Sequence, residues 1–134
     1  MVKFGMGFTF RFGWGTYTKD NEKMVRDFLR EMIIEEKMQL GYIGCLATIP
    51  NMHGHFAITA SKENQEKFVL IDKRKWQKRW AEKSGQSMNA LLIEDIYDSK
   101  GWSDYIDKNV HEDVDSTMTW YGKKLLNRRE NDEE

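Results

Sequence analysis

The feature that most constrains this fold is an alternating apolar segment near the start of the chain. Five large apolar residues recur at every second position, so they share one face of a β-strand over about residues 4–14. They are Phe4, Met6, Phe8, Phe10 and Phe12. Thr9 and Arg11 point to the opposite face. A strand with one apolar face is typical of a sheet that is covered by helices.

Two longer segments predict helices of the kind that cover a sheet. They span about residues 21–38, with Asp20 as N-cap, and about residues 73–83, with Asp72 as N-cap. The first has apolar residues at i, i+4 spacing along one side. In the second, Trp76 and Trp80 share one side, and we expect them to anchor the helix to the sheet.

Four further segments predict strands, and one a short helix. The strands span about residues 41–49, 53–60, 88–96 and 117–121. Pro50 and Asn51 form a turn signal between the first two, which makes these a hairpin. Ser99 or Ser103 is a suitable cap for a short helix that precedes the last strand.

This order of elements predicts an α+β domain with a central, mainly antiparallel sheet of about four or five strands flanked by helices. The chain has 134 residues, without repeats or an internal linker, so we expect one domain over residues 1–125. Residues 126–134 form a charged tail that we expect to be disordered.

Composition predicts an intracellular protein, of the cytoplasm or of a eukaryotic nucleus. Cys45 is the single cysteine, which excludes an internal disulfide and is compatible with a reducing compartment. No apolar run approaches the roughly 20 residues that span a bilayer, and the N-terminus does not resemble a signal peptide. We therefore expect neither secretion nor membrane insertion. The net charge is −1, and without the four acids of the tail the remainder is weakly basic, which is permissive for DNA binding.

His53 and His55 are the first candidates for chemistry. They are two residues apart on a predicted strand, so both imidazoles face the same side, where they could share one metal ion. Two polar surface histidines near a turn are the plainer interpretation, and the pair alone does not exclude it.

Tyr105 and Lys108 are the second candidates. A spacing of three places them on one side of the predicted short helix, with Asn109 beside them. A phenol has a pKa of about 10, so a metal ion and a lysine ammonium would favour its nucleophilic phenolate form. A half-buried tyrosine in an ordinary amphipathic helix is the alternative.

A histidine pair on a strand, followed along the chain by a tyrosine and a lysine on a helix, is a pattern that resembles the HUH endonucleases. It is similar to the replication initiator (Rep) proteins of small single-stranded DNA viruses and plasmids. The histidine motif is MHGHFAI at residues 52–58, and the tyrosine motif is SDYIDKN at residues 103–109. FTFRFG at residues 8–13 takes the place of the first family motif, and DSTMTWYG at residues 115–122 resembles the strand after the tyrosine helix. The resemblance covers roughly residues 4–122.

The resemblance implies a ferredoxin- or RRM-like HUH fold and a defined reaction. In this family a tyrosine attacks a phosphodiester of single-stranded DNA at an origin hairpin, which gives a 5′-phosphotyrosine and a free 3′-hydroxyl, and a second transfer rejoins the strand. By this resemblance Tyr105 is the nucleophile, Lys108 positions the phosphate, and His53 and His55 bind Mn²⁺ or Mg²⁺.

Two departures from the family pattern concern the metal site. Gly54 replaces a bulky residue between the histidines, and we expect looser packing beneath the site. Cys45 stands where plant-virus members have a carboxylate ligand. We expect Asn109 to be the third ligand, with Cys45 or a nearby acid as alternatives. Two imidazoles and an amide favour Mn²⁺ or a softer ion over Mg²⁺.

DNA would also need a cationic surface. The predicted second helix carries Lys73, Lys75, Lys78 and Arg79, which we expect to follow phosphates, and Arg11 on the first strand is a further candidate. A solvated helix face is the alternative interpretation of this charge run.

The leading hypothesis is therefore a nicking and joining domain that acts with a host helicase and polymerase, because no phosphate-binding ATPase loop is present. One candidate tyrosine suggests that joining reuses it or recruits a second protomer, so a homodimer is possible. A small HUH single-strand transposase and a non-catalytic α+β nucleic-acid-binding module are the alternatives.

Overall fold

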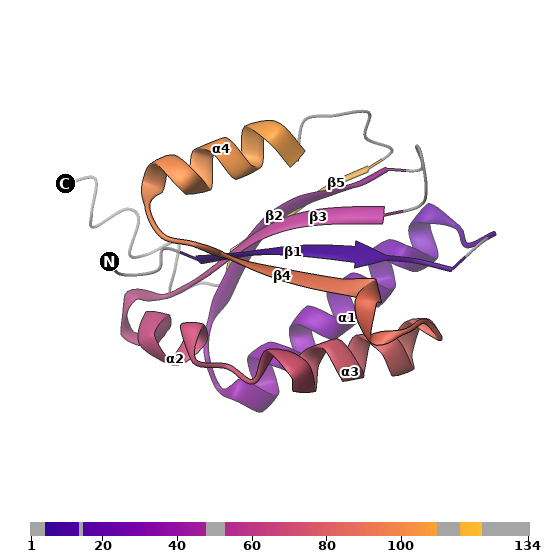
Figure 1. Cartoon of the computed structure of the whole chain (residues 1–134), viewed down its shortest axis with the longest axis horizontal. Coiled ribbons are helices and arrows are strands. Elements are labelled where there is room, and N and C mark those ends of the chain that lie inside the picture. The colour runs from indigo at the N-terminus through magenta and orange to yellow at the C-terminus, as the bar shows by residue number, and fades with distance from the viewer. Residues whose placement is uncertain (1–4, 14, 48–52, 110–115, 122–134) are drawn as a thin grey trace.

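A computed structural model describes residues 5–13, 15–47, 53–109 and 116–121 (Figure 1). The elements in chain order are β1 (Gly5–Arg11), α1 (Thr18–Glu36), β2 (Leu40–Ala47), β3 (His53–Ala60), the 3-10 turn η1 (Lys62–Asn64), α2 (Gln65–Val69), α3 (Lys73–Ser84), the 3-10 turn η2 (Met88–Ala90), β4 (Leu91–Ile96), α4 (Ser99–Asn109) and β5 (Ser116–Tyr121). The predicted tail, and the turn at Pro50 and Asn51, lie outside the described residues.

The strands form one five-stranded sheet in the order β4-β1-β3-β2-β5, and every neighbouring pair is antiparallel. This confirms the predicted α+β class and the sheet of four or five strands. The first four strands and the helices α1 and α3 make a ferredoxin-like arrangement, with β1 and β3 at its centre. β5 extends this arrangement at the β2 edge.

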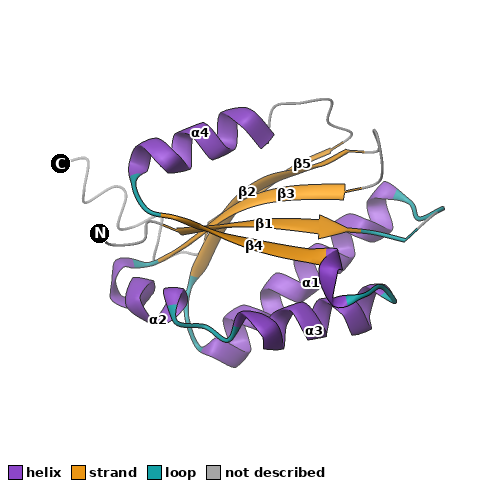
Figure 2. Cartoon of the chain, viewed as in Figure 1, coloured by secondary structure: helices purple, strands orange, loops and turns teal. Residues whose placement is uncertain are grey.

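The helices are divided unequally between the two faces of the sheet. Figure 2 shows α1, α2 and α3 together below the sheet and α4 alone above it. The lower face is therefore the main core, and the upper face lies beneath one amphipathic helix that follows β4 directly. Among the described residues, no helix combines the length and the apolar composition that crossing a bilayer requires.

The alternating residues of β1 form the centre of the lower core. Phe8 and Phe10 are fully buried, and Phe12 nearly so. The Phe10 ring packs against Trp80, with 4.7 Å between ring centroids, and against Phe56, at 5.5 Å. Trp76 and Trp80 are both fully buried, as predicted, which anchors α3 to the sheet. Such a cluster of large aromatic rings stabilises the sheet by burial and by edge-to-face contacts.

Helix starts differ from the predictions where caps were inferred from residue type. α1 begins at Thr18, three residues before the predicted start, so Asp20 lies inside the helix instead of capping it. Asn21 is buried, and its side chain donates a hydrogen bond to the Thr16 hydroxyl (3.0 Å), which fixes the entry into the helix. α4 begins at Ser99, and Asp98 accepts a hydrogen bond from the Gly101 backbone, so neither predicted serine is its cap.

The segment between β3 and α3 contains elements that the sequence analysis does not predict. η1 and α2 occupy it, and Phe68 of α2 is buried against the core. The predicted strand over 88–96 begins only at Leu91, because Met88–Ala90 form η2. Asp72 caps α3 as predicted, accepting a hydrogen bond from the Lys75 backbone (3.2 Å).

Candidate functional site

The upper face of the sheet brings the candidate residues of three strands together. In the pairing of β1 with β3, Thr9 is opposite His55 and Arg11 is opposite His53. In the pairing of β2 with β3, Cys45 is opposite His55. Paired residues of antiparallel strands lie on the same face. All five side chains therefore belong to the face that α4 covers.

His53 and His55 lie side by side on the central strand β3. Their ring centroids are 5.0 Å apart, and the ring planes are inclined by 77°. Two imidazoles that bind one ion at metal–nitrogen distances of about 2.1 Å, in neighbouring coordination positions, have centroids roughly 4.6–5.3 Å apart. The observed separation fits shared ligation of one divalent ion.

The hydrogen bonding of His55 also fits a metal ligand. Its Nδ1 lies 3.1 Å from the Thr9 hydroxyl oxygen. A ligating histidine ordinarily uses its second ring nitrogen for such a contact, which fixes the ring and the tautomer. With Nδ1 in contact with Thr9, an ion would bind His55 through Nε2.

Tyr105 of α4 lies on the same face, against β1. A Cβ atom placed on Gly7 would lie 2.4 Å from Cε2 and 2.9 Å from the hydroxyl oxygen of Tyr105, so the ring sits directly over this glycine. Gly7 and Thr9 are two residues apart, which is about 7 Å along the strand. The ring lies between α4 and the sheet, and it does not point into the aromatic core on the lower face.

Thr9 lies on the same sheet face as Tyr105 and the histidine pair. Burial raises the pKa of the Tyr105 phenol well above its ordinary value of 10. The Thr9 hydroxyl lowers this pKa to a smaller extent, and the same hydroxyl lies 3.1 Å from Nδ1 of His55. The negative charge of Glu94 raises it further. In this arrangement the phenol is protonated at neutral pH.

Among the described side chains, the histidine pair lies without a third histidine, cysteine or acid in position to share an ion with it. Within that part of the chain, no group of three His, Cys, Asp or Glu residues is placed to hold an ion, so neither Cys45 nor an acid completes the pair there. Cys45 is buried next to His55. Lys108 and Asn109 end α4, but their side chains lie outside the described residues, and the roles predicted for them stay predictions.

The structure does not bring the predicted cationic residues of α3 to this site. α3 lies below the sheet, whereas the histidines and Tyr105 lie above it (Figure 1). Most of its basic side chains form ion pairs: Lys73 with Asp95, Lys75 with Glu35 and Glu36, Arg79 with Glu31 and Glu35, and Lys83 with Glu31. Lys78 is exposed and, in the described part of the chain, unpaired. The charge run on α3 mainly joins this helix to α1.

Arg11 is the predicted DNA contact that does lie beside the histidines. It is exposed, directly opposite His53, and within the described residues its guanidinium makes no ion pair.

The packing around Gly54 is tighter than the sequence analysis predicts. A Cβ atom there would lie 2.6 Å from Leu46 Cδ2 and 3.1 Å from Phe56 Cε1, so the space beneath the site is filled, not loose.

Gly7, Thr9 and Glu94 contribute to the site without having been assigned a role by the sequence analysis. Thr9 and Gly7 are on the outward-facing positions of β1, and Glu94 is opposite Gly7 on β4. The sequence did contain a signal for the role of Gly7. Gly5 and Gly7 leave the outward face of an otherwise bulky strand without side chains, so another residue can pack there. Which residue would fill that space could not be read from the strand itself.

Comparison with known proteins assigns no family or function to this site. No protein-family model matches the chain, and no curated protein matches it.

Proposed function

We propose that this chain is a metal-dependent enzyme that nicks and joins single-stranded DNA, of the replication-initiator kind. The single observation that carries the proposal is the position of Tyr105 over Gly7, on the sheet face that also holds Thr9 and the histidine pair. A nucleophile and two ligating imidazoles on one sheet face, from elements far apart in the sequence, are the parts that such a reaction needs.

The proposed reaction is a transesterification at phosphorus. The phenol of Tyr105 loses its proton to solvent, and its oxygen forms a bond to the phosphorus of the scissile phosphate. The bond from phosphorus to the 3′ oxygen breaks, and that oxygen takes up a proton. The products are a 5′-phosphotyrosine and a free 3′-hydroxyl, and attack by a 3′-hydroxyl reverses the step. The step exchanges one phosphodiester bond for another, so no nucleotide cofactor is consumed.

The protein's own residues position these groups. Gly7 leaves room for the Tyr105 ring against β1, and the Thr9 hydroxyl stabilises the phenolate that forms there. His53 and His55 would hold the divalent ion, for which Mn²⁺ suits two imidazoles better than Mg²⁺ does. When bound, the ion would supply the positive charge that polarises the phosphate and favours the phenolate. Arg11, exposed beside His53, would contact the DNA strand.

One observation favours a second candidate, the non-catalytic nucleic-acid-binding module. Burial raises the pKa of Tyr105, and a ring that fills the space over a glycine is also what a purely structural tyrosine does. In that case the histidines would be surface residues, and the protein would bind nucleic acid without forming a covalent bond to it.

The test is formation of a covalent protein–DNA adduct. Wild-type protein with Mn²⁺ and a single-stranded origin hairpin that is labelled on the 3′ side of the scissile phosphate should yield a labelled protein band that survives denaturation. Tyr105→Phe should abolish the adduct and retain DNA binding, since only the attacking oxygen is removed. An adduct of undiminished yield in Tyr105→Phe would overturn the assignment of the nucleophile.

A matched variant distinguishes the two candidate functions. Tyr97→Phe removes a phenol oxygen from an exposed tyrosine near the start of α4 and should leave adduct formation unchanged. If neither wild-type protein nor Tyr97→Phe forms an adduct on viral, plasmid or transposon-end hairpins, while both bind these DNAs, the non-catalytic module is the better description. Preference for transposon ends would instead select the single-strand transposase.

A further inference from the structure

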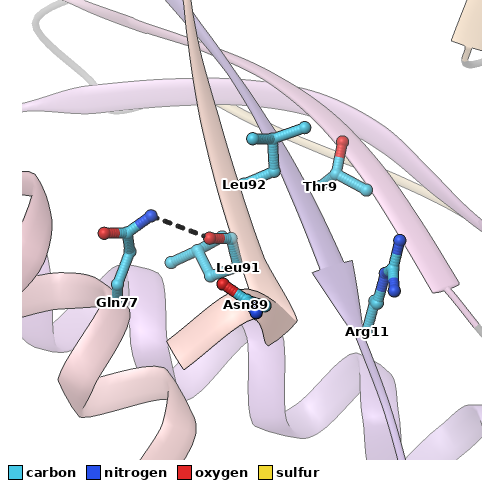
Figure 3. Close-up of a pocket in the computed structure, with 6 residues that line it drawn as sticks. All are labelled: Thr9, Arg11, Gln77, Asn89, Leu91 and Leu92. Carbon is cyan, nitrogen blue, oxygen red and sulfur yellow. Dashed lines mark hydrogen bonds between the residues drawn. The ribbon is translucent and has the colours of Figure 1, made fainter. Parts of the chain in front are cut away.

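A pocket of about 210 Å³ opens beside the histidine pair, at the edge of the sheet where β4 begins. Its lining residues come from β1, α3, η2 and β4: Thr9, Arg11, Gln77, Asn89, Leu91 and Leu92. In Figure 3, Thr9 and Leu92 lie next to each other, with Arg11 on one side and Gln77 on the other. Thr9 also contacts His55, so the pocket is adjacent to the proposed nicking site.

The lining combines an apolar surface with hydrogen-bonding groups and contains no carboxylate. Leu92 is a large apolar side chain that is 51% exposed, which leaves its surface available to a ligand. Among the described residues, the Asn89 carboxamide and the Arg11 guanidinium make no hydrogen bond or ion pair, and both are exposed. Such a surface suits a flat, uncharged ring that carries hydrogen-bonding groups along one edge.

The back of this pocket is held in place by Gln77. Its side-chain nitrogen donates a hydrogen bond to the Leu91 backbone oxygen (3.0 Å), as the dashed line in Figure 3 marks. This bond ties α3 to the first residue of β4, immediately after the η2 turn that carries Asn89. The exposed carboxamide of Asn89 is therefore presented from a fixed backbone, and Gln77 acts as a positioning residue.

The size of the pocket restricts the ligand further. Pockets for drug-sized ligands have volumes of about 300–1,000 Å³, so a volume near 210 Å³ suits a fragment such as one nucleobase. Asparagine and glutamine pair best with the N6 and N7 atoms of adenine, and arginine with the O6 and N7 atoms of guanine. Both preferred partners are purines.

We propose that this pocket binds a purine base of single-stranded DNA, in the nucleotide next to the scissile phosphate. The choice of a flanking nucleotide rests on the proposed function, because it requires a phosphate at His53 and His55. With the phosphate there, the strand would pass over Thr9, and its next base would reach Leu92, Asn89 and Arg11. The pocket would thus select where along a single strand the cut is made.

The test measures DNA binding without catalysis. Short labelled single strands that differ only in one central purine, pyrimidine or abasic position are titrated with the full chain, in chelator and at fixed salt, by fluorescence anisotropy. We expect the purine strand to bind about tenfold more tightly than the other two. Asn89→Ala or Arg11→Ala should abolish the preference for purine. Arg74→Ala, which removes an exposed cation of α3 from the other side of the sheet, is the control and should keep the preference for purine.

Two results of this titration would overturn the proposal. Equal affinity of wild-type protein for the three strands overturns it, and so does a purine preference that survives both Asn89→Ala and Arg11→Ala. Circular dichroism on each variant checks that it is folded. Because neither metal nor Tyr105 takes part, loss of the adduct in Tyr105→Phe leaves the base preference unchanged, and failure of the pocket is distinct from failure of the nicking reaction.

Discussion

At the scale of single residues, the site depends on one position without a side chain. Gly7 lies under the Tyr105 ring, and a Cβ atom there would be 2.4 Å from the ring and 2.9 Å from its hydroxyl oxygen. Two residues further along β1, the Thr9 hydroxyl contacts His55 and lowers the pKa of the phenol. Any displacement of the ring away from β1 therefore moves the nucleophile relative to Thr9 and the histidine pair.

Gly7→Ala should consequently impair adduct formation. The added methyl group moves the ring, and a displacement of about 1 Å at a reacting group can lower a rate roughly a hundredfold. We also expect a loss of about 1–3 kcal/mol in the free energy of unfolding, the usual effect of overpacking. Initial rates of adduct formation and chemical denaturation measure the two effects.

Gly13→Ala is the matched control for this substitution. A Cβ atom on Gly13 would meet the flexible end of the Gln86 side chain at 3.2 Å, away from Tyr105. This variant should form the adduct at nearly the wild-type rate. If Gly7→Ala matched it, Tyr105 would not act from the position seen here.

At the scale of elements, the charged side of α3 serves the packing of two helices. Arg79 lies 2.9 Å from Glu35, and Lys75 lies 3.1 Å from the same carboxylate. Lys75 and Arg79 also lie over the Trp76 ring, at 5.0 and 4.9 Å from its centroid. These pairs are between a quarter and two fifths exposed, so each stabilises the protein only slightly, and their joint effect is to fix α3 against α1.

This network predicts how stability depends on pH. Arg79 first, and then Lys75, lower the pKa of Glu35 from 4.5 by hydrogen bonding to its carboxylate. A carboxyl group whose pKa is lower in the folded state stabilises the protein above its unfolded pKa, and this contribution is lost as the pH falls through the folded pKa. Glu35→Gln should therefore be less stable than wild type at neutral pH, and the difference should vanish in acid.

Urea denaturation over a range of pH measures this difference. Glu66→Gln, on the exposed side of α2 and without an ion pair among the described residues, is the control and should track wild type at every pH. A Glu35→Gln protein as stable as wild type at neutral pH would mean that the network contributes nothing measurable.

At the scale of the whole molecule, one face of the sheet forms the core and the other carries the candidate site. The lower face holds the aromatic core and three helices, whereas the upper face carries the histidines, Thr9 and Tyr105 beneath α4 (Figures 1 and 2). Ligand binding on the upper face therefore need not disturb the core, and it should stabilise the folded state by mass action.

Metal binding gives the test at this scale. At a Mn²⁺ concentration of about a hundred times its Kd, the folded state should gain about 2.7 kcal/mol, seen as a higher melting temperature that chelator reverses. We expect a smaller effect of Mg²⁺. In His53→Ala/His55→Ala the melting temperature should not respond to either ion. A response to Mn²⁺ that persists in the double variant would place the ion elsewhere.

The sequence by itself determined the features that depend on local periodicity. Alternation placed Met6, Phe8 and Phe10 of β1 on one face, and it placed His53 and His55 together on one face of β3, because successive side chains of a strand point in opposite directions. Phe4, which the same alternation includes, lies outside the described residues. The α+β class followed from the order of such segments. Helix starts were less well predicted, since Asp20 suits a cap by type although the contacts of Asn21 set the actual start.

Only the tertiary structure decided which distant residues meet. α4 packs on the upper face, so Tyr105 reaches Gly7 and Thr9 near the opposite end of the chain. α1 packs beside α3, so the lysines and Arg79 that resembled a DNA surface are paired with acids. Local patterns cannot specify such pairings, because they depend on which faces pack together, and this is settled by burial across the whole domain.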